Sequence, residues 1–163
     1  MGSRWAERAA AALALALAAA LLAGTRPVEA QQVTELGVLG IATASDPALA
    51  GAGVYAAVRT SLRTRVSAAA TVGASAGAAA FRGELVGHFL LNPTRRSGVG
   101  AYGAGGLAVV AGPVDQGYLV LALGLEARPG APSGWFVVGG VGGGARLAVG
   151  WRWRRLPPGW LGR

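Results

Sequence analysis

The chain has 163 residues, a formal net charge of +8 and no cysteine, so disulfides and thiolate metal sites are excluded. All of its basic residues are arginines, and they occur singly or in pairs without a basic helix or an RNA-binding aromatic motif. The charge therefore does not indicate a nucleic-acid partner. Glycine and alanine are abundant, but regularly placed Val, Leu, Phe and Trp argue against a disordered chain.

The first segment has the three parts of an export signal. Arg4 and Arg8 precede an apolar run over residues 9–23, which is about as long as a signal core and short for a membrane helix. Small residues then occupy the positions that a signal peptidase reads, with cleavage expected after Ala30. Residues 1–30 are therefore predicted to be a cleaved secretory signal peptide. The alternative is an uncleaved anchor helix.

From residue 33 onward, apolar side chains alternate with small or polar ones, and Pro- and Gly-containing turns interrupt the pattern. Most of the segments reach the 9–11 residues of a membrane-spanning strand, whereas soluble strands average about five or six. Their even number is that of a closed bacterial barrel. We therefore predict an all-β fold: a closed antiparallel up-and-down β-barrel of eight strands over residues 31–155, followed by a C-terminal tail, 156–163. The expected strands are residues 33–43, 53–62, 65–75, 79–91, 98–110, 117–127, 134–141 and 145–154.

The sense of the alternation indicates what surrounds the barrel. In the segment 117–127, the odd positions are Leu119, Leu121, Leu123 and Leu125, and the even face includes Glu126. A soluble barrel would place leucines inside and charges in water. Leucines outside and a carboxylate inside are typical of a strand that faces lipid.

The same parity predicts a network of charged and polar side chains inside the barrel. Glu35 is near the start of the first strand and Arg152 near the end of the last, so closure of the barrel should bring them together. The alternative for Glu35 is a solvated N-terminal stub below the barrel. The predicted lumen network comprises Glu35, Arg59, Arg82, Glu84, His88, Glu126, Arg146 and Arg152.

Aromatic side chains gather near the expected strand ends. Such rings favour the membrane interface, where an apolar body meets a polar rim, although they also serve as ordinary core residues. The predicted interface aromatics are Tyr55, Phe81, Phe89, Tyr118, Trp135, Trp151 and Trp153.

Together, the export signal, the eight strands and the ending of residues 146–153 resemble the small eight-stranded bacterial outer-membrane β-barrel family. In that family the last strand alternates and ends on aromatics that the barrel-assembly machinery recognises. Trp151 and Trp153 match those aromatic positions, and Ala148 stands where the family often has glycine. The chain departs from the pattern by continuing through residues 156–163. The resemblance implies an outer-membrane location, with membrane lipid and the assembly machinery as partners.

Several motifs that suggest chemistry lack their structural context. The glycine patterns over residues 98–103 and 140–145 fit a dinucleotide fingerprint, but expected strands follow both, where a nucleotide site needs a helix. His88 is the only histidine. Outer-membrane lipid A deacylases carry a serine two residues after their histidine, and here that position is Leu90. We expect no catalytic site, cofactor, nucleotide or metal.

The leading interpretation is an outer-membrane barrel with a structural, adhesive or surface-interaction role and a lumen filled by side chains. One alternative is a secreted, soluble, lipocalin-like barrel that binds a small apolar ligand, and another is an outer-membrane enzyme acting on lipid. With eight strands both ends fall on one side, here the periplasm. The turns expected outside are residues 44–52, 76–78, 111–116 and 142–144.

Overall fold

The structure is a computed structural model that describes residues 33–158. The predicted signal peptide and its cleavage site, and the last part of the predicted tail, lie outside the described residues. Within 33–158 no helix is long and apolar enough to cross a membrane. The strands are β1 (Thr34–Ala44), β2 (Leu49–Arg59), β3 (Thr64–Ser75), β4 (Ala78–Leu90), β5 (Val99–Ala111), β6 (Gln116–Ala127), β7 (Ser133–Val141) and β8 (Ala145–Arg155).

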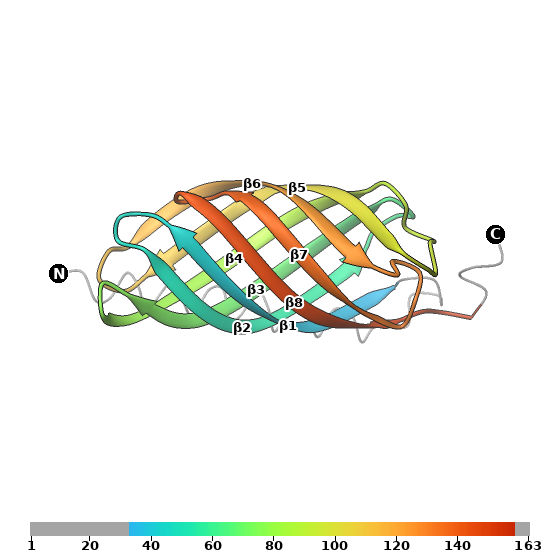
Figure 1. Cartoon of the computed structure of the whole chain (residues 1–163), viewed down its shortest axis with the longest axis horizontal. Helices are drawn as coiled ribbons and strands as arrows, with labels where there is room; N and C mark the ends of the chain where they lie inside the picture. Colours follow the sequence, from blue (N-terminus) through green and yellow to red (C-terminus); the bar gives the residue numbers. More distant parts are fainter. Residues whose placement is uncertain (1–32, 159–163) are drawn as a thin grey trace.

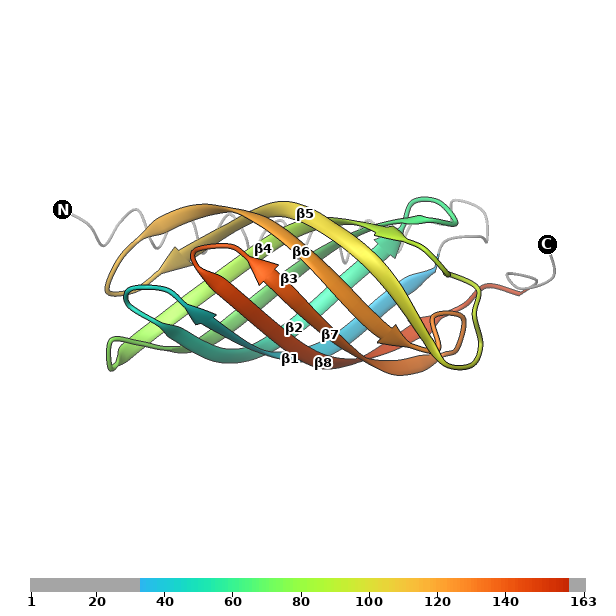
Figure 2. The ribbon, with the colours of Figure 1, turned by 45° about the horizontal axis from the view of Figure 1, so that its top comes forward.

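These eight strands form a closed barrel, which confirms the predicted fold (Figure 1). Each strand pairs antiparallel with the next, and β8 pairs with β1 from Thr34 opposite Arg155 to Ala44 opposite Ala145. Closure gives every strand a hydrogen-bonded neighbour on both sides, although residues 116–120, at the start of β6, extend beyond the pairing with β7. The strands run obliquely to the long axis in both ribbon views (Figures 1 and 2).

The barrel has two different ends. At the terminal end, on the right in Figure 1, β1 begins and β8 ends, and the connections are residues 60–63, 91–98 and 128–132. At the opposite, hairpin end, the connections are residues 45–48, 76–77, 112–115 and 142–144. All the connections at the hairpin end are short, which leaves little chain beyond the strands there.

One strand boundary differs from expectation. The second strand was expected over residues 53–62, but β2 begins at Leu49 and ends at Arg59. The turn expected over residues 44–52 includes Gly51, but this glycine is needed inside the strand, because a Cβ at Gly51 would lie 2.6 Å from the carbonyl oxygen of Val72 on β3. The glycine permits close approach of two backbones rather than a turn.

The inner wall combines apolar side chains with facing glycines. Tyr102 on β5 lies directly opposite Gly124 on β6, and a Cβ at Gly124 would overlap the tyrosine ring. Phe136 on β7 has the same relation to Gly150 on β8. Two large rings thus fit inside a narrow barrel because their cross-strand neighbours have no side chain.

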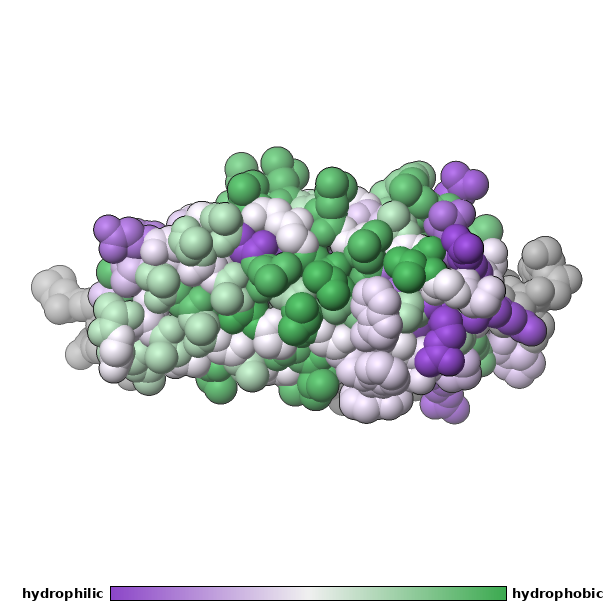
Figure 3. All heavy atoms as spheres, in the orientation of Figure 1, coloured by the Kyte–Doolittle hydropathy of each residue, from purple (hydrophilic) through white to green (hydrophobic). Residues whose placement is uncertain are grey.

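The outer wall is almost free of polar groups. Every outward position on the eight strands is Ala, Gly, Val, Leu, Phe or Trp except at Thr34, Thr64, Ser133 and Arg155, which all lie at the terminal end. Large apolar residues stand out along the middle of the barrel, and hydrophilic residues gather at its right-hand, terminal end (Figure 3). The outer surface of the barrel, which faces water in a soluble protein, is therefore apolar.

Candidate functional site

The interior near the terminal end contains a dense group of ion pairs. Glu35 Oε1 lies 3.1 Å from Nε of Arg59, and Glu35 Oε2 lies 3.1 Å from Nη1 of Arg65 and 3.3 Å from Nη1 of Arg152. Glu126 on β6 contacts the same Arg65 at 3.1 Å and also pairs with Arg152. These side chains are at most 2% exposed. With Arg154, which approaches both carboxylates, they form the terminal cluster: Glu35, Arg59, Arg65, Glu126, Arg152 and Arg154.

The terminal cluster contains four arginines and two glutamates, so it has an excess of positive charge. Backbone carbonyl oxygens accept hydrogen bonds from some of the guanidinium groups and stabilise them there. Arg59 donates to the carbonyl oxygens of Pro93, at 3.1 Å, and Pro129, at 2.9 Å. Arg154 donates to the carbonyl oxygen of Ala131 at 3.0 Å. Because buried guanidinium groups need acceptors for their N–H groups, these bonds also tie the turns at the terminal end to the interior.

A smaller group, the hairpin-end cluster, consists of Arg82, Glu84 and Arg146. Glu84 Oε1 accepts from Nε of Arg82 at 2.8 Å and pairs with Nη2 of the same arginine at 2.7 Å. Its other oxygen accepts from Arg146 on β8 at 2.8 Å. These side chains are 2–8% exposed. One carboxylate therefore bridges β4 to β8 across the barrel.

The residues predicted as one lumen network form two separate clusters. Glu35, Arg59, Glu126 and Arg152 meet in the terminal cluster. Arg82, Glu84 and Arg146 meet in the hairpin-end cluster, and His88 belongs to neither. Glu35 is 1% exposed, inside the barrel rather than in a solvated stub.

Two members of the terminal cluster, Arg65 and Arg154, were missing from the predicted network. Arg154 lies two positions after Arg152 on β8, so the alternation of the strand already indicated that it points inward. Arg65 stood at the very start of its expected strand, where alternation gives little guidance, but it lies directly opposite Arg59.

His88 lies between the two clusters and bonds to groups from β3. Arg65 Nη2 is 3.3 Å from its Nδ1, and Ser67 Oγ is 2.7 Å from its Nε2. Arginine only donates, so Nδ1 must accept and Nε2 must carry the proton. Nε2 then donates to Ser67, whose hydroxyl donates to the carbonyl oxygen of Val86 at 3.4 Å. A general base needs the opposite polarity, with the histidine accepting from the serine.

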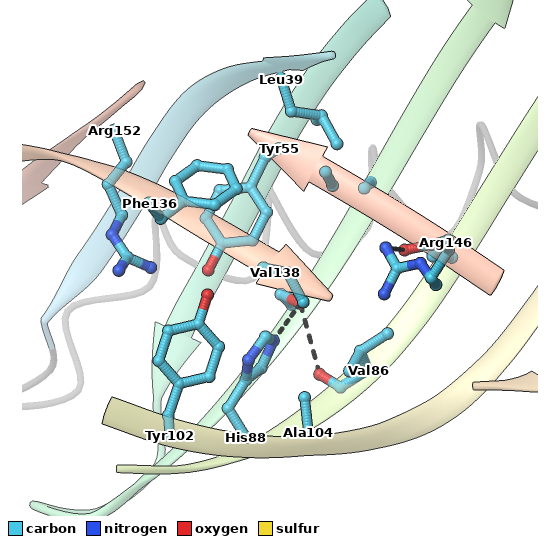
Figure 4. A pocket seen from close by; sticks show the side chains of 14 residues that line it. Leu39, Tyr55, Val86, His88, Tyr102, Ala104, Phe136, Val138, Arg146 and Arg152 are labelled. Carbon is cyan, nitrogen blue, oxygen red and sulfur yellow. Dashed lines mark hydrogen bonds and ion pairs between the residues drawn. The ribbon is translucent and has the colours of Figure 1, made fainter. Parts of the chain in front are cut away.

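Next to His88 is an internal cavity of about 40 Å³. Tyr55, Tyr102 and Phe136 line it together with His88, and the labelled rings point into the same space (Figure 4). The ring centroids of Tyr55 and Phe136 are 5.7 Å apart, and those of His88 and Tyr102 are 5.4 Å apart. The Arg65 guanidinium lies 5.0 Å from the centroid of Tyr102. An aromatic layer thus separates the two charged clusters.

Five of the predicted interface aromatics occupy outward positions. Trp135 and Trp151 face each other across β7 and β8, and Trp153 follows two positions later on β8. These three side chains are 38–53% exposed. Phe89 is near the terminal end of β4, and Phe81 is on the same outward face, nearer the hairpin end.

The other two are corrections. Tyr55 is 7% exposed and belongs to the internal core, because it shares the inward face of β2 with Arg59. It lies in mid-strand rather than near an end, because β2 begins at Leu49. Tyr118 shares the inward face of β6 with Val120 and packs at the hairpin end of the lumen. Both rings were predicted to lie at the membrane interface because they are near expected strand ends. Whether a side chain faces inward or outward depends instead on its parity along the strand.

The glycine patterns belong to strands and a turn. Residues 98–103 lead into β5, and residues 140–145 cross the turn between β7 and β8; Gly98 and Gly143 have φ values of 71° and 81°. Neither pattern opens a helix. Over residues 33–158, no group of three His, Cys, Asp or Glu side chains has the geometry to hold a metal ion.

Comparison with solved structures finds a similar barrel. The N-terminal β-barrel domain of OprF from Pseudomonas aeruginosa matches with a TM-score of 0.57 and 15% sequence identity, over 77% of this chain and 100% of that domain. At this identity the similarity concerns the fold. No protein-family model matches the chain. No curated protein matches it either.

Proposed function

We propose that this protein is an outer-membrane β-barrel that spans the bilayer with its eight strands and has a structural or surface-interaction role. The observation that carries the proposal is the outer wall, where polar residues occur only at the terminal end. Lipid offers no hydrogen-bond partners, so a spanning β-structure must be closed and apolar outside. Charges directed inward avoid the cost of placing them in hydrocarbon.

A solute-conducting channel is not part of the proposal. Fully buried guanidinium groups cross the interior near the terminal end, and the cavity between the clusters is only about 40 Å³. An eight-stranded barrel is just wide enough for side chains to fill. We therefore propose that the lumen is closed by the two clusters and the aromatic layer between them.

The alternatives fit the interior less well. Pockets for drug-sized ligands have volumes of roughly 300–1,000 Å³ and are mostly apolar. The internal cavity is far smaller and is bounded by Glu84, Arg146 and Arg152, which disfavours a carrier of apolar ligands. The hydrogen bond from His88 to Ser67 has the wrong direction for a hydrolase acting on lipid.

Export and assembly complete the proposal. Residues 1–30 direct secretion, and the outward Trp151 and Trp153 at the end of β8 serve as the signal for the barrel-assembly machinery. The terminal end faces the periplasm. The hairpin connections, such as residues 45–48 and 112–115, then face outside and are too short to form a large receptor-binding surface.

Cell fractionation tests the proposal directly. The expressed chain should sediment with outer membranes, resist extraction by salt and alkali, dissolve in detergent and migrate faster on a gel before boiling than after it. A freely soluble periplasmic protein would overturn the membrane assignment.

Orientation is tested separately with cysteines introduced into this cysteine-free chain. Asp46→Cys at the hairpin end should react with a membrane-impermeant maleimide on intact cells, and Arg128→Cys should react only after the outer membrane is opened. The reverse pattern would mean that the hairpin end faces the periplasm.

A further inference from the structure

Exposed positive charge is concentrated at one end of the barrel. Five exposed arginines lie on or beside the connections of the terminal end, and no acidic side chain of residues 33–158 is exposed there. At the hairpin end the exposed charges are instead Asp46 and Asp115. We call the five the arginine crown: Arg63, Arg95, Arg96, Arg128 and Arg155.

The backbone that carries the crown is fixed from inside the barrel. The carbonyl oxygens of Pro93 and Pro129 accept hydrogen bonds from the buried Arg59, at 3.1 and 2.9 Å. The two turns are also bonded to each other, since the carbonyl oxygen of Arg95 accepts from the Gly130 amide at 2.8 Å. In the same way the Arg128 amide donates to the carbonyl oxygen of Gly98, at 2.8 Å. The two turns that carry Arg95, Arg96 and Arg128 are therefore ordered, which reduces the entropy lost on binding a ligand.

The crown lies immediately beyond the apolar outer wall. Trp135, Trp151, Trp153 and Phe89 are exposed on the strands next to it, and Figure 3 shows hydrophilic residues adjoining the apolar surface at this end. Exposed tryptophans favour the depth of the lipid headgroups. The crown arginines, on the connections beyond these strand ends, would then lie at the depth of the lipid phosphate groups.

We propose that the arginine crown binds the phosphate groups of anionic glycerophospholipids in the leaflet at the terminal end. The inference rests on the membrane-spanning function proposed above and adds a preferred lipid class. Guanidinium groups bind phosphate through two parallel N–H donors, so arginine suits this ligand better than a point charge does. Attraction between basic residues and an anionic surface adds to this and decreases with salt.

The experiment measures lipid retention by the purified protein in detergent micelles, using native mass spectrometry with dioleoyl phosphatidylglycerol or dioleoyl phosphatidylcholine. The wild-type chain should retain the anionic lipid about tenfold more than the zwitterionic one, and the difference should shrink with added salt. The variant Arg63→Gln/Arg96→Gln/Arg128→Gln should lose most of this preference. Its three altered side chains are exposed and form no hydrogen bond in the structure, so the barrel should still fold.

Two control variants test whether the lipid preference depends on the arginines of the crown or on the net charge of the whole protein. Arg63→Lys/Arg96→Lys/Arg128→Lys keeps the positive charge but lacks the paired N–H donors, so its preference should lie between those of the wild-type chain and the triple Gln variant. Asp46→Asn raises the net charge at the hairpin end and should change nothing. An unchanged preference in the triple Gln variant would overturn the inference. So would displacement of the lipid by millimolar inorganic phosphate or by a short RNA, which would indicate a different ligand.

A further measurement distinguishes failure of this inference from failure of the proposed function. The refolded chain is added to vesicles of phosphatidylcholine alone, and insertion is scored by protease protection and heat-dependent gel migration. Insertion without any preference for the anionic lipid overturns only the inference about the crown. Absence of insertion into any vesicle overturns the membrane-spanning function on which it rests.

Discussion

The two faces of β6 follow opposite rules within one strand. On the outer face, Leu119 and Leu123 each keep 76% of their surface exposed, whereas Val120 and Glu126 on the inner face keep 1%. Adjacent residues are only about 3.3 Å apart along the strand, yet each meets a different environment. A soluble barrel would bury the leucines and expose the carboxylate.

The inner and outer walls place different requirements on their side chains. An inner residue needs particular partners: Glu126 accepts from Arg65, and the Tyr102 ring needs the space above Gly124. An outer residue needs only to be apolar. Substitutions inside should therefore depend on the partner that is lost, and substitutions outside on the polarity and depth of the new side chain.

The largest effect is expected from Glu35→Ala. Arg59 and Arg152 both pair with the Glu35 carboxylate inside the barrel, and the substitution removes this shared partner. Breaking a buried ion pair from one side destabilises by about 3–5 kcal/mol. Urea unfolding in detergent, followed by tryptophan fluorescence, measures the loss. The exposed Asp46→Ala is the control and should leave the midpoint unchanged. Equal, small effects of the two variants would contradict the role of the buried cluster.

The outer wall is tested by Leu121→Arg, in the middle of β6. An arginine that faces lipid at the bilayer midplane costs about 2–4 kcal/mol, and one near the interface about 0–1 kcal/mol. Val99→Arg, at the terminal end of β5, is therefore the matched control. Unfolding from lipid bilayers gives both values. If the barrel is soluble instead, Leu121→Arg should leave stability unchanged and improve solubility.

Glycines on the two walls should differ as well. In Gly124→Ala the new methyl group would collide with the Tyr102 ring, and overpacking of this kind costs about 1–3 kcal/mol. Gly103 faces outward on β5 and has open space around a Cβ, so Gly103→Ala should be neutral. Thermal unfolding in detergent compares the two variants. Similar stabilities would show that the inner wall adapts to added volume.

The smallest expected effect is the coupling between Glu35 and Arg152. Because both belong to the terminal cluster, their alanine substitutions should be non-additive by about 0.5–3 kcal/mol. Glu35 and Arg146 belong to different clusters, and their effects should add within about 0.3–0.5 kcal/mol. A double-mutant cycle in urea provides both numbers. Additivity in the first pair would argue against a direct interaction across the β1–β8 closure.

Much of the architecture was predictable from the sequence. Seven strands begin and end within one residue or so of their expected bounds, because Pro- and Gly-containing turns separate them clearly. β2 is the exception: residues 49–52 were expected in a turn, but they belong to the strand, where Gly51 lies close to the β3 backbone. Tyr55 was misplaced for the same reason: its expected strand started too late, and the ring appeared to stand at a rim.

Local alternation in the sequence is enough to assign most residues to the inner or the outer wall, because it has a period of two and needs no knowledge of distant contacts. Alternation does not predict which inward side chains contact one another. Arg65 touches Glu35 from β1 and Glu126 from β6, strands far from each other in sequence. Such contacts depend on the tilt of the strands and the stagger at which the sheet closes, and only the tertiary structure sets these. Closure therefore decided that the lumen charges form two clusters rather than one network.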